Sequence, residues 1–146
     1  MHTELFKMKH LDMIDPLGGD QILQQVKAPF SEVDTSGNIL AMTLLDGDKV
    51  ISICGVYKIW DGVGEAFTIM CKDIRKYGRA LYTTYLLNLP IIFKSLELWR
   101  IQATVIVDFK DGIKFMEGLK FKREGMMEKW TPEGRDVYMY AMVKED

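Results

Sequence analysis

The stretch Arg75-Lys76-Tyr77-Gly78-Arg79-Ala80 places three cationic side chains and a glycine where a strand passes into a helix. A helix N-terminus carries a partial positive charge and unpaired backbone N–H groups, so cations are unfavourable there. Asp73 is the only acidic residue close by. A bound phosphate group would relieve the repulsion, and Gly78, which has no Cβ, would let it approach the backbone. A solvated basic turn with a capping glycine explains this stretch equally well.

The residues before this stretch predict a meander of three antiparallel strands. Ile39–Leu45 is one apolar run, Asp46–Asp48 has the composition of a turn, and Val50–Trp60 is the returning strand. Asp61–Gly64 is a second turn, and Glu65–Cys71 is the strand that leads into the basic stretch.

The remaining pattern predicts an α+β fold. The expected elements are a strand at Leu5–Lys9, a helix from Asp20 through Ile22, Leu23 and Val26, a polar segment at 28–37, a helix from Gly78 to Leu89, a kink or second helical turn at Pro90, a strand at Arg100–Val107, a helix at Asp111–Gly118, and strands at Leu119–Lys129 and Val137–Val143. Together they favour a mixed, mostly antiparallel sheet of six to seven strands flanked by helices.

Composition and charge exclude several function classes. Of the 146 residues, 48% are hydrophobic and 27% are charged, which is typical of a single globular domain over residues 1–146. The net charge of −2 argues against a general nucleic-acid coat. No apolar run reaches the roughly eighteen residues of a membrane span, so we expect no membrane partner. Cys54 and Cys71 lie in apolar runs, which favours buried, reduced thiols over a disulfide, and we therefore expect a cytoplasmic location. Two histidines do not make a zinc site.

This order of elements, with the residues at its joints, resembles the GNAT superfamily of acyl-CoA-dependent N-acyltransferases. The family motif is Arg or Gln, two residues, Gly, one residue, then Gly or Ala, and residues 75–80 match it. The ending Ile113–Phe121 resembles the family's helix leading into Leu-Gly-Phe, and Gly55 lies where many members have a glycine. The resemblance spans roughly residues 38–143.

The resemblance implies that acetyl-CoA is the cofactor and that an amine of a small molecule or protein is the acceptor. In the family, backbone N–H groups of the turn hold the pyrophosphate of coenzyme A; the positions here are Arg75, Lys76, Tyr77, Gly78, Arg79 and Ala80. The preceding strand residues, Ile69, Met70 and Cys71, would separate from the neighbouring strand and pair with the pantetheine arm. The oligomeric state is open between monomer and homodimer.

The sequence also departs from the family at three positions. Many members have a Tyr that protonates the departing thiolate, an Asn at the exit of the fifth strand, and a glycine before the final phenylalanine. The corresponding residues here are Met116, Phe109 and Lys120. A thioether cannot donate a proton, so the commonest general acid is missing. Short phage-encoded GNAT-like proteins have a comparable motif, which is a second resemblance.

Three residues are candidates for catalysis, and two of them also have a structural alternative. Glu65 opens the strand before the motif and is a candidate base, or else an exposed acid at a strand end. The backbone N–H of Met70 is a candidate for polarising the thioester carbonyl. Tyr138, with Tyr140, is placed by strand alternation to reach the site or to fill the core. Cys71 is better explained as a buried strand residue than as a nucleophile.

Two functions follow. One is an N-acetyltransferase that moves an acetyl group from acetyl-CoA to a primary amine by direct transfer. The other is a GNAT-fold binding or structural protein with weak or no turnover, of phage type, which the residue at position 116 motivates.

Overall fold

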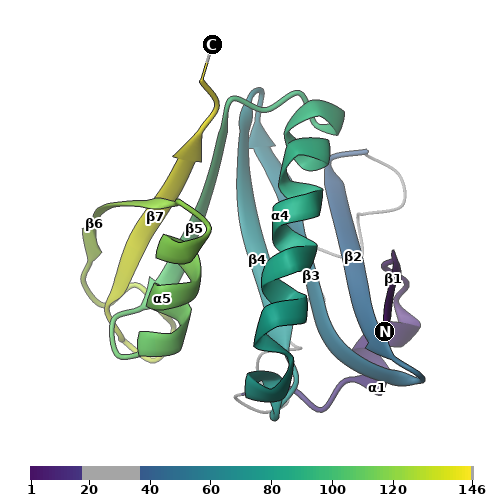
Figure 1. The fold of residues 1–146 in the computed structure, drawn as a ribbon. Coiled ribbons are helices and arrows are strands. Elements are labelled where there is room, and N and C mark those ends of the chain that lie inside the picture. Colours follow the sequence, from purple (N-terminus) through teal and green to yellow (C-terminus); the bar gives the residue numbers. More distant parts are fainter. Residues whose placement is uncertain (18–36, 146) are drawn as a thin grey trace.

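The computed structural model describes residues 1–17 and 37–145, which contain one seven-stranded sheet in the order β1-β2-β3-β4-β5-β7-β6 (Figure 1). The strands are β1 His2–Leu5, β2 Ile39–Asp46, β3 Lys49–Trp60, β4 Val63–Met70, β5 Arg100–Ile106, β6 Lys122–Met127 and β7 Val137–Val143. The helices are α1 Lys9–Met13, the 3-10 helix η1 Ile74–Tyr77, α4 Gly78–Ser95 and α5 Lys110–Gly118. Only β4 and β5 pair in parallel. The expected mixed, mostly antiparallel α+β sheet is confirmed.

The helices lie on both faces of this sheet. Thr68 of β4 is bonded to Tyr85 of α4, whereas Thr43 of β2 is bonded to His10 of α1. Thr43 pairs with Ile53 of β3, and Ile53 pairs with Ile69 of β4, so the side chains of Thr43 and Ile69 lie on the same face. Thr68 is the neighbour of Ile69 in the sequence. Because successive strand residues point to opposite faces, α4 and α1 cover opposite sides. Figure 1 shows α5 on the same side as α4, in front of β5 and β7.

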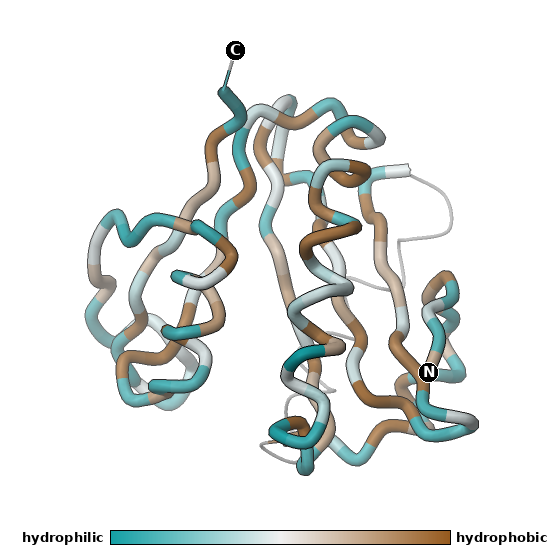
Figure 2. The backbone as a smooth tube through the Cα atoms, viewed as in Figure 1, coloured by the Kyte–Doolittle hydropathy of each residue, from teal (hydrophilic) through white to brown (hydrophobic). Residues whose placement is uncertain are grey.

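The core lies at the middle of the sheet and thins toward β6. Residues 50–56 of β3 are all buried, because both faces of this central strand are covered. Figure 2 shows hydrophobic residues along β2, β3 and α4. Edge strand β6 has almost no buried residue and carries Lys122, Arg123 and Glu124, charges that oppose pairing with another chain.

The expectation of a strand at Leu5–Lys9 was wrong, and His10 supplies the physical reason. The strand ends at Leu5, and the following residues turn into α1. The imidazole of His10 is fully buried, where its Nδ1 accepts a hydrogen bond from the Lys7 N–H at 3.0 Å and its Nε2 lies 2.9 Å from Glu4 Oε1. These bonds bend the chain into a turn despite its alternating pattern.

The helix after the basic stretch also runs further than expected. It continues through Pro90 to Ser95 as one helix, where the sequence predicted a kink or a second helical turn. Proline removes one backbone donor and leaves the carbonyl of Leu86 without it. Leu86 and Pro90 are exposed on the solvent side of α4, where water can bind that carbonyl. The burial of Leu89, Ile92 and Phe93 therefore outweighs the cost of the proline, and the helix continues.

Helix α5 ends in a left-handed residue at the position where the family has glycine. The Lys120 N–H donates to the Glu117 carbonyl at 3.0 Å, and the Phe121 N–H donates to the Met116 carbonyl at 3.1 Å. This pair of bonds is a Schellman motif, and Lys120 has the positive φ of 74° that it requires. The chain therefore adopts the left-handed conformation at this position without a glycine.

The helix expected from Asp20 through Val26, and the polar segment 28–37 apart from Gly37, lie outside the described residues.

Candidate active site

The candidate site begins where β4 and β5 separate. The two strands pair at only three positions, Val63 with Arg100, Gly64 with Ile101 and Glu65 with Gln102, although both continue beyond them. Figure 1 shows the strands diverging from this point toward the ends of α4 and α5. The expected separation of the strands before the motif is therefore present. Glu65 is the last residue of β4 that pairs with β5, and we call this point the vertex.

The free edge of β4 exposes alternate peptide groups. The Cys71 N–H donates to the Ile51 carbonyl of β3 at 2.9 Å, so the groups of Cys71 and Ile69 face β3. By the same alternation, the peptide groups of Ala66, Thr68 and Met70 face the separated side. Of the three expected strand residues, only Met70 therefore directs its backbone toward the opening.

Residues 15–17 cover the far end of this edge. The Leu17 N–H donates to the Met70 carbonyl at 2.7 Å, and the Lys72 N–H donates to the Asp15 carbonyl at 3.0 Å. The edge available to another chain or ligand thus lies between the vertex and this short bridge, at Ala66 and Thr68 and at the N–H of Met70. Thr68 was not identified from the sequence, although strand alternation alone could have indicated it.

The turn after β4 forms the open end of the site. No side chain caps the N-terminus of α4, and its first turn contains no acidic residue. Gly78 has an ordinary helical φ of −53°, and a Cβ at this position would meet nothing within 4 Å. Neither strain nor crowding within the described chain requires a glycine here. The backbone at Gly78 is therefore open on its Cβ side, and no side chain caps the first turn of α4, two features that suit an anion.

The four side chains of the turn differ in how they are held. Arg75 reaches across the opening to Asp111 of α5, with Nε and Nη2 at 2.9 Å and 2.8 Å from Oδ2. The Tyr77 hydroxyl donates to Asp46 at 3.2 Å. Lys76 lies 3.9 Å from Asp73, and Arg79 forms no side-chain hydrogen bond or ion pair within residues 1–17 and 37–145.

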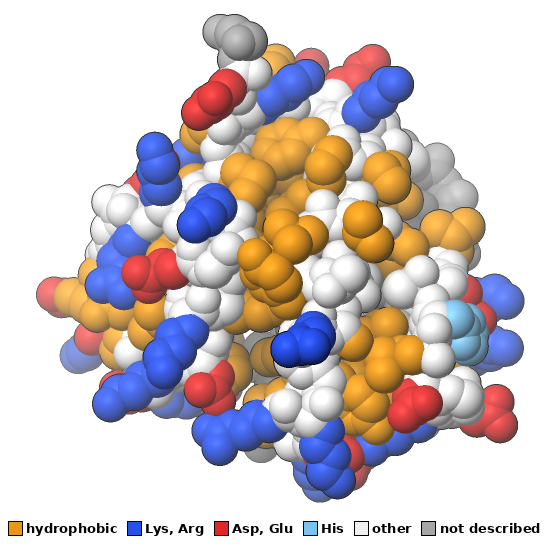
Figure 3. Space-filling view, in the orientation of Figure 1, with side chains coloured by type: hydrophobic (Ala, Val, Ile, Leu, Met, Phe, Trp, Pro, Cys, Tyr) orange, Lys and Arg blue, Asp and Glu red, His pale blue; other side chains and the backbone are white. Residues whose placement is uncertain are grey.

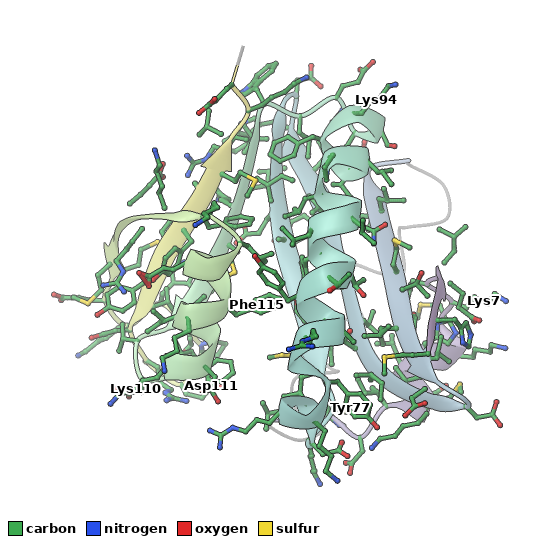
Figure 4. The ribbon with its side chains drawn as sticks, in the orientation of Figure 1. Lys7, Tyr77, Lys94, Lys110, Asp111 and Phe115 are labelled. Carbon is green, nitrogen blue, oxygen red and sulfur yellow. The ribbon has the colours of Figure 1, made fainter. Side chains whose placement is uncertain are left out.

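Positive charge gathers at this end of the molecule. Figure 3 shows Lys and Arg side chains around the lower ends of α4 and α5, and Figure 4 places Lys110 and Asp111 on one side of the opening and Tyr77 on the other. Asp73, the one acid within the turn, is bonded to Lys49 Nζ at 2.6 Å. That ammonium holds the pKa of Asp73 down at about 2, so the carboxylate is already compensated and adds little repulsion toward an anion.

Glu65 is half-buried at the vertex, on the sheet face opposite α4. Burial raises the pKa of its carboxyl, and hydrogen-bonding interactions with Gln102 and Tyr57 act in the opposite direction. A carboxylate whose pKa is raised toward neutrality is a better proton acceptor at physiological pH. Glu65 is thus a partly desolvated base candidate rather than an exposed acid at a strand end.

Tyr138 does not lie with Glu65. Tyr138 is in register with Val105, which packs under Gly112 of α5, so its ring is on the α5 face. Gln102, the partner of Glu65, is three residues from Val105 and points to the other face. The Arg123 guanidinium lies 3.8 Å from the centroid of the Tyr138 ring. The catalytic role of Tyr138 stays a prediction, and any substrate contact would come from the α5 side.

Both cysteines are buried and unpaired. Burial raises the pKa of the Cys71 thiol to about 11, and interactions with Asp73 add to the effect. Burial also raises the pKa of Cys54 to about 11. Both thiols are therefore protonated at neutral pH, which favours packing over nucleophilic chemistry.

Two aromatic residues contact each other between α4 and α5. The rings of Tyr85 and Phe115 meet edge-to-face with centroids 5.3 Å apart, and the Tyr82 hydroxyl donates to the Gly118 carbonyl at 3.2 Å. Figure 4 shows Phe115 between the two helices. The buried Tyr85 hydroxyl is bonded to Thr68, so this contact also fixes the side chain of a residue on the free edge.

Within residues 1–17 and 37–145, no group of three or more His, Cys, Asp or Glu side chains could hold a metal ion. No helix in the described part of the chain is long and apolar enough to cross a membrane.

This geometry is that of the GNAT fold. A crystal structure of ribosomal-protein-S5-alanine acetyltransferase from Vibrio fischeri matches 99% of this chain and 93% of its own with a TM-score of 0.76 at 16% identity. A GNAT-family acetyltransferase from Bacillus anthracis matches 99% of this chain and 95% of its own with a TM-score of 0.72 at 18% identity. A chimeric spermidine N-acetyltransferase derived from Vibrio cholerae matches 98% and 96% with a TM-score of 0.77 at 16% identity.

The sequence relationship is more distant than the structural likeness. An uncharacterized N-acetyltransferase, p20, from Bacillus licheniformis is 27% identical over 118 residues, which cover 78% of this chain and 66% of p20. The match thus spans about two thirds of that relative. No family model matches the sequence. The resemblance inferred from residues 75–80 is confirmed as a GNAT fold, whereas the phage-type resemblance stays a prediction.

Proposed function

We propose that this protein is an N-acetyltransferase that moves an acetyl group from acetyl-CoA to a primary amine by direct transfer. The observation that supports it most strongly is the early separation of β4 from β5, which opens toward an uncapped helix N-terminus. A fold that only needed a stable sheet would continue the pairing, because each lost backbone bond leaves polar groups to be satisfied by something else.

Several features of the site fit acetyl-CoA. The alternate peptide groups of Ala66, Thr68 and Met70 suit the amide-containing pantetheine arm, which can pair with a strand edge. The open N-terminus of α4 at Gly78 suits the pyrophosphate, and Arg79 is available as an additional cation. Bound acetyl-CoA would supply the activated acyl group as a thioester.

The chain's own residues would then carry out three tasks. Glu65 would accept the proton of the acceptor's ammonium group, so that the amine becomes a nucleophile. The N–H groups of Thr68 and Met70 would donate hydrogen bonds to the oxygen on which negative charge develops. The side chains of Tyr85 and Phe115 would exclude water from the side of the opening that faces α4 and α5.

The second function, binding without turnover, rests on Met116. This half-buried residue lies on α5 where many relatives have a tyrosine, and its thioether cannot donate a proton. Protonation of the departing thiolate would then depend on water. A slow enzyme and an inactive binding protein are both consistent with this substitution, so turnover must be measured directly.

The test has two stages. Unfolding is first followed with and without acetyl-CoA; at one hundred times the dissociation constant, binding adds about 2.7 kcal/mol to the free energy of unfolding. Release of free coenzyme A is then measured against a panel of amines, including a polyamine and peptides with free N-termini. Stabilisation with release supports the enzyme, and stabilisation without release for any acceptor supports the binding protein. If millimolar acetyl-CoA changes nothing, the enzyme and a protein that binds acetyl-CoA without turnover are both wrong, and a structural role is left.

The acceptor, the monomeric or homodimeric state and the cytoplasmic location remain predictions. The structural neighbours include acetyltransferases for a ribosomal protein and for spermidine. Those two acceptors are therefore reasonable members of the first panel.

A further inference from the structure

A row of polar side chains crosses the sheet face opposite α4 and ends at Glu65. Arg100 of β5 donates from Nη1 and Nη2 to the two carboxylate oxygens of Glu124 of β6, at 3.0 Å and 2.6 Å. The Nε of Arg100 donates to Gln102 Oε1 at 3.0 Å. Gln102 is in register with Glu65 and interacts with its carboxylate. The side chains of three strands thus form one connected path.

The backbone of β6 is irregular where this path begins. The register of β6 against β7 shifts between Arg123 and Gly125, which leaves Glu124 without a partner on β7. A bulge of this kind re-aims a side chain, and bulges are over-represented next to active sites. Between β6 and β5, the residue of β7 in register with Gln102 is the small, buried Ala141, so no large side chain blocks the contact.

Arg100 fixes which end of the Gln102 amide faces Glu65. Because the Oε1 of Gln102 accepts from Arg100, its Nε2 is left to donate toward the carboxylate. Without Arg100 the amide is free to turn by half a rotation and to present an oxygen to Glu65, which would be repulsive. Arg100 can hold both neighbours because its guanidinium carries donors in a rigid fork; a lysine cannot do this.

We propose that Arg100, fixed by Glu124, is a positioning residue that locks Gln102 in one amide orientation and thereby holds the Glu65 carboxylate ready to accept a proton from the acceptor amine. This inference rests on the proposed function for its catalytic meaning, but the path itself can be tested without turnover. The groups that face Glu65 are Tyr57 from β3 and Gln102 from β5, with the Arg100–Glu124 ion pair behind Gln102.

The direct test is a carbon-13 NMR titration of the Glu65 carboxyl in the whole protein. In Gln102→Leu every charge is kept but the donor is lost, so the pKa of Glu65 should rise by about one unit, a typical shift for the loss of a hydrogen bond to a charged form. Arg100→Met should give a rise of similar size. Arg135→Met is the matched control, because Arg135 forms an exposed pair with Asp108 at 3.7 Å, and it should leave Glu65 unchanged.

Glu124→Gln separates positioning from a simple charge effect. If Arg100 acted only through its charge, removal of the opposing carboxylate would lower the pKa of Glu65. If it acts by position, loosening the guanidinium should raise that pKa, and Arg100→Lys should restore little of the wild-type value. An unchanged pKa in Gln102→Leu, or a fall in Glu124→Gln, would overturn the inference even if one of the Arg100 variants fails to fold.

Kinetic and binding measurements keep this inference distinct from the proposed function. The acid limb of the kcat/KM pH profile should move to higher pH in Gln102→Leu. For a one-unit shift, activity should fall up to about ten-fold at pH values below the wild-type pKa, with an unchanged plateau at high pH. Affinity for acetyl-CoA should not change, because these residues lie away from the turn. If the wild type has no turnover, the proposed function fails, while the Glu65 titration still decides whether the path exists.

Discussion

Replacing Gly78 by glutamate should separate the stability of the protein from its affinity for acetyl-CoA. The residue begins α4, has a φ of −53°, and has open space where a Cβ would lie, so the fold accepts a side chain. An acidic group in the first turn interacts favourably with the helix dipole by about 0.3–1 kcal/mol, and replacing glycine in a helix adds about 0.5–1 kcal/mol. The ligand-free variant should therefore be more stable than wild type, by roughly 2–8 °C in Tm.

The same change should weaken binding. A carboxylate about 4 Å from a bound phosphate costs between about 1 kcal/mol in bulk water and about 4 kcal/mol at a partly buried site. The dissociation constant for acetyl-CoA should then rise roughly five-fold to a thousand-fold. Gly78→Gln is the matched control, since its side chain has nearly the same size without the charge.

The assay combines thermal unfolding of the free variants with isothermal titration calorimetry of acetyl-CoA. The expected result is higher Tm for both variants and a much weaker dissociation constant for glutamate than for glutamine. Equal dissociation constants for the two variants would show that no anionic group of the ligand lies at the N-terminus of α4.

Four further predictions follow from single contacts. Glu65→Gln should lower kcat about 100-fold or more while the dissociation constant of acetyl-CoA changes less than two-fold, as steady-state kinetics and calorimetry can show. The pKa of Glu65 is raised in the folded state, so its contribution to stability is fully present below the unfolded-state pKa of 4.5 and is lost as pH rises through the folded-state pKa. In urea unfolding, Glu65→Gln should therefore be more stable than wild type near neutral pH and equally stable near pH 3. Lys120→Gly should raise the free energy of unfolding by about 1 kcal/mol, since Lys120 has the left-handed φ of 74°; no gain in denaturant unfolding would contradict this. Asp111→Asn should tighten acetyl-CoA binding up to about five-fold by releasing Arg75, an effect that should shrink in high salt.

The central part of the fold was predictable because each local signal agreed with the tertiary structure. The turn residues at Asp46–Asp48 and Asp61–Gly64 delimit β2, β3 and β4 within about two residues of the expected bounds. The change from alternating to helical periodicity at Gly78 marks the start of α4. These signals depend only on neighbours in the sequence, which is why they can be read without a structure.

The misses arise where a distant contact decides. A buried imidazole at position 10 turns the chain early, and burial of one face of α4 overrides Pro90. The separation of β4 and β5 was expected from the family resemblance rather than from the residues themselves, because nothing in their composition ends a ladder at Glu65.

The site was predictable only in part for the same reason. The motif located the turn and the strand before it, but strand parity places Tyr138 and Glu65 on opposite faces, which a list of candidate residues does not reveal. The path from Glu124 to Glu65 depends on a bulge in β6, and a bulge leaves no periodic signal in the sequence.

The most direct test of the account is a titration of nitrogen-15-labelled protein with acetyl-CoA, followed by amide chemical shifts. We expect saturable binding, with the largest changes at the amides of Thr68 and Met70 on the free edge of β4 and at those of residues 76–80 in the turn. Binding that leaves those amides unmoved, or no binding at millimolar acetyl-CoA, would show that the opening between β4 and β5 does not hold the acyl donor.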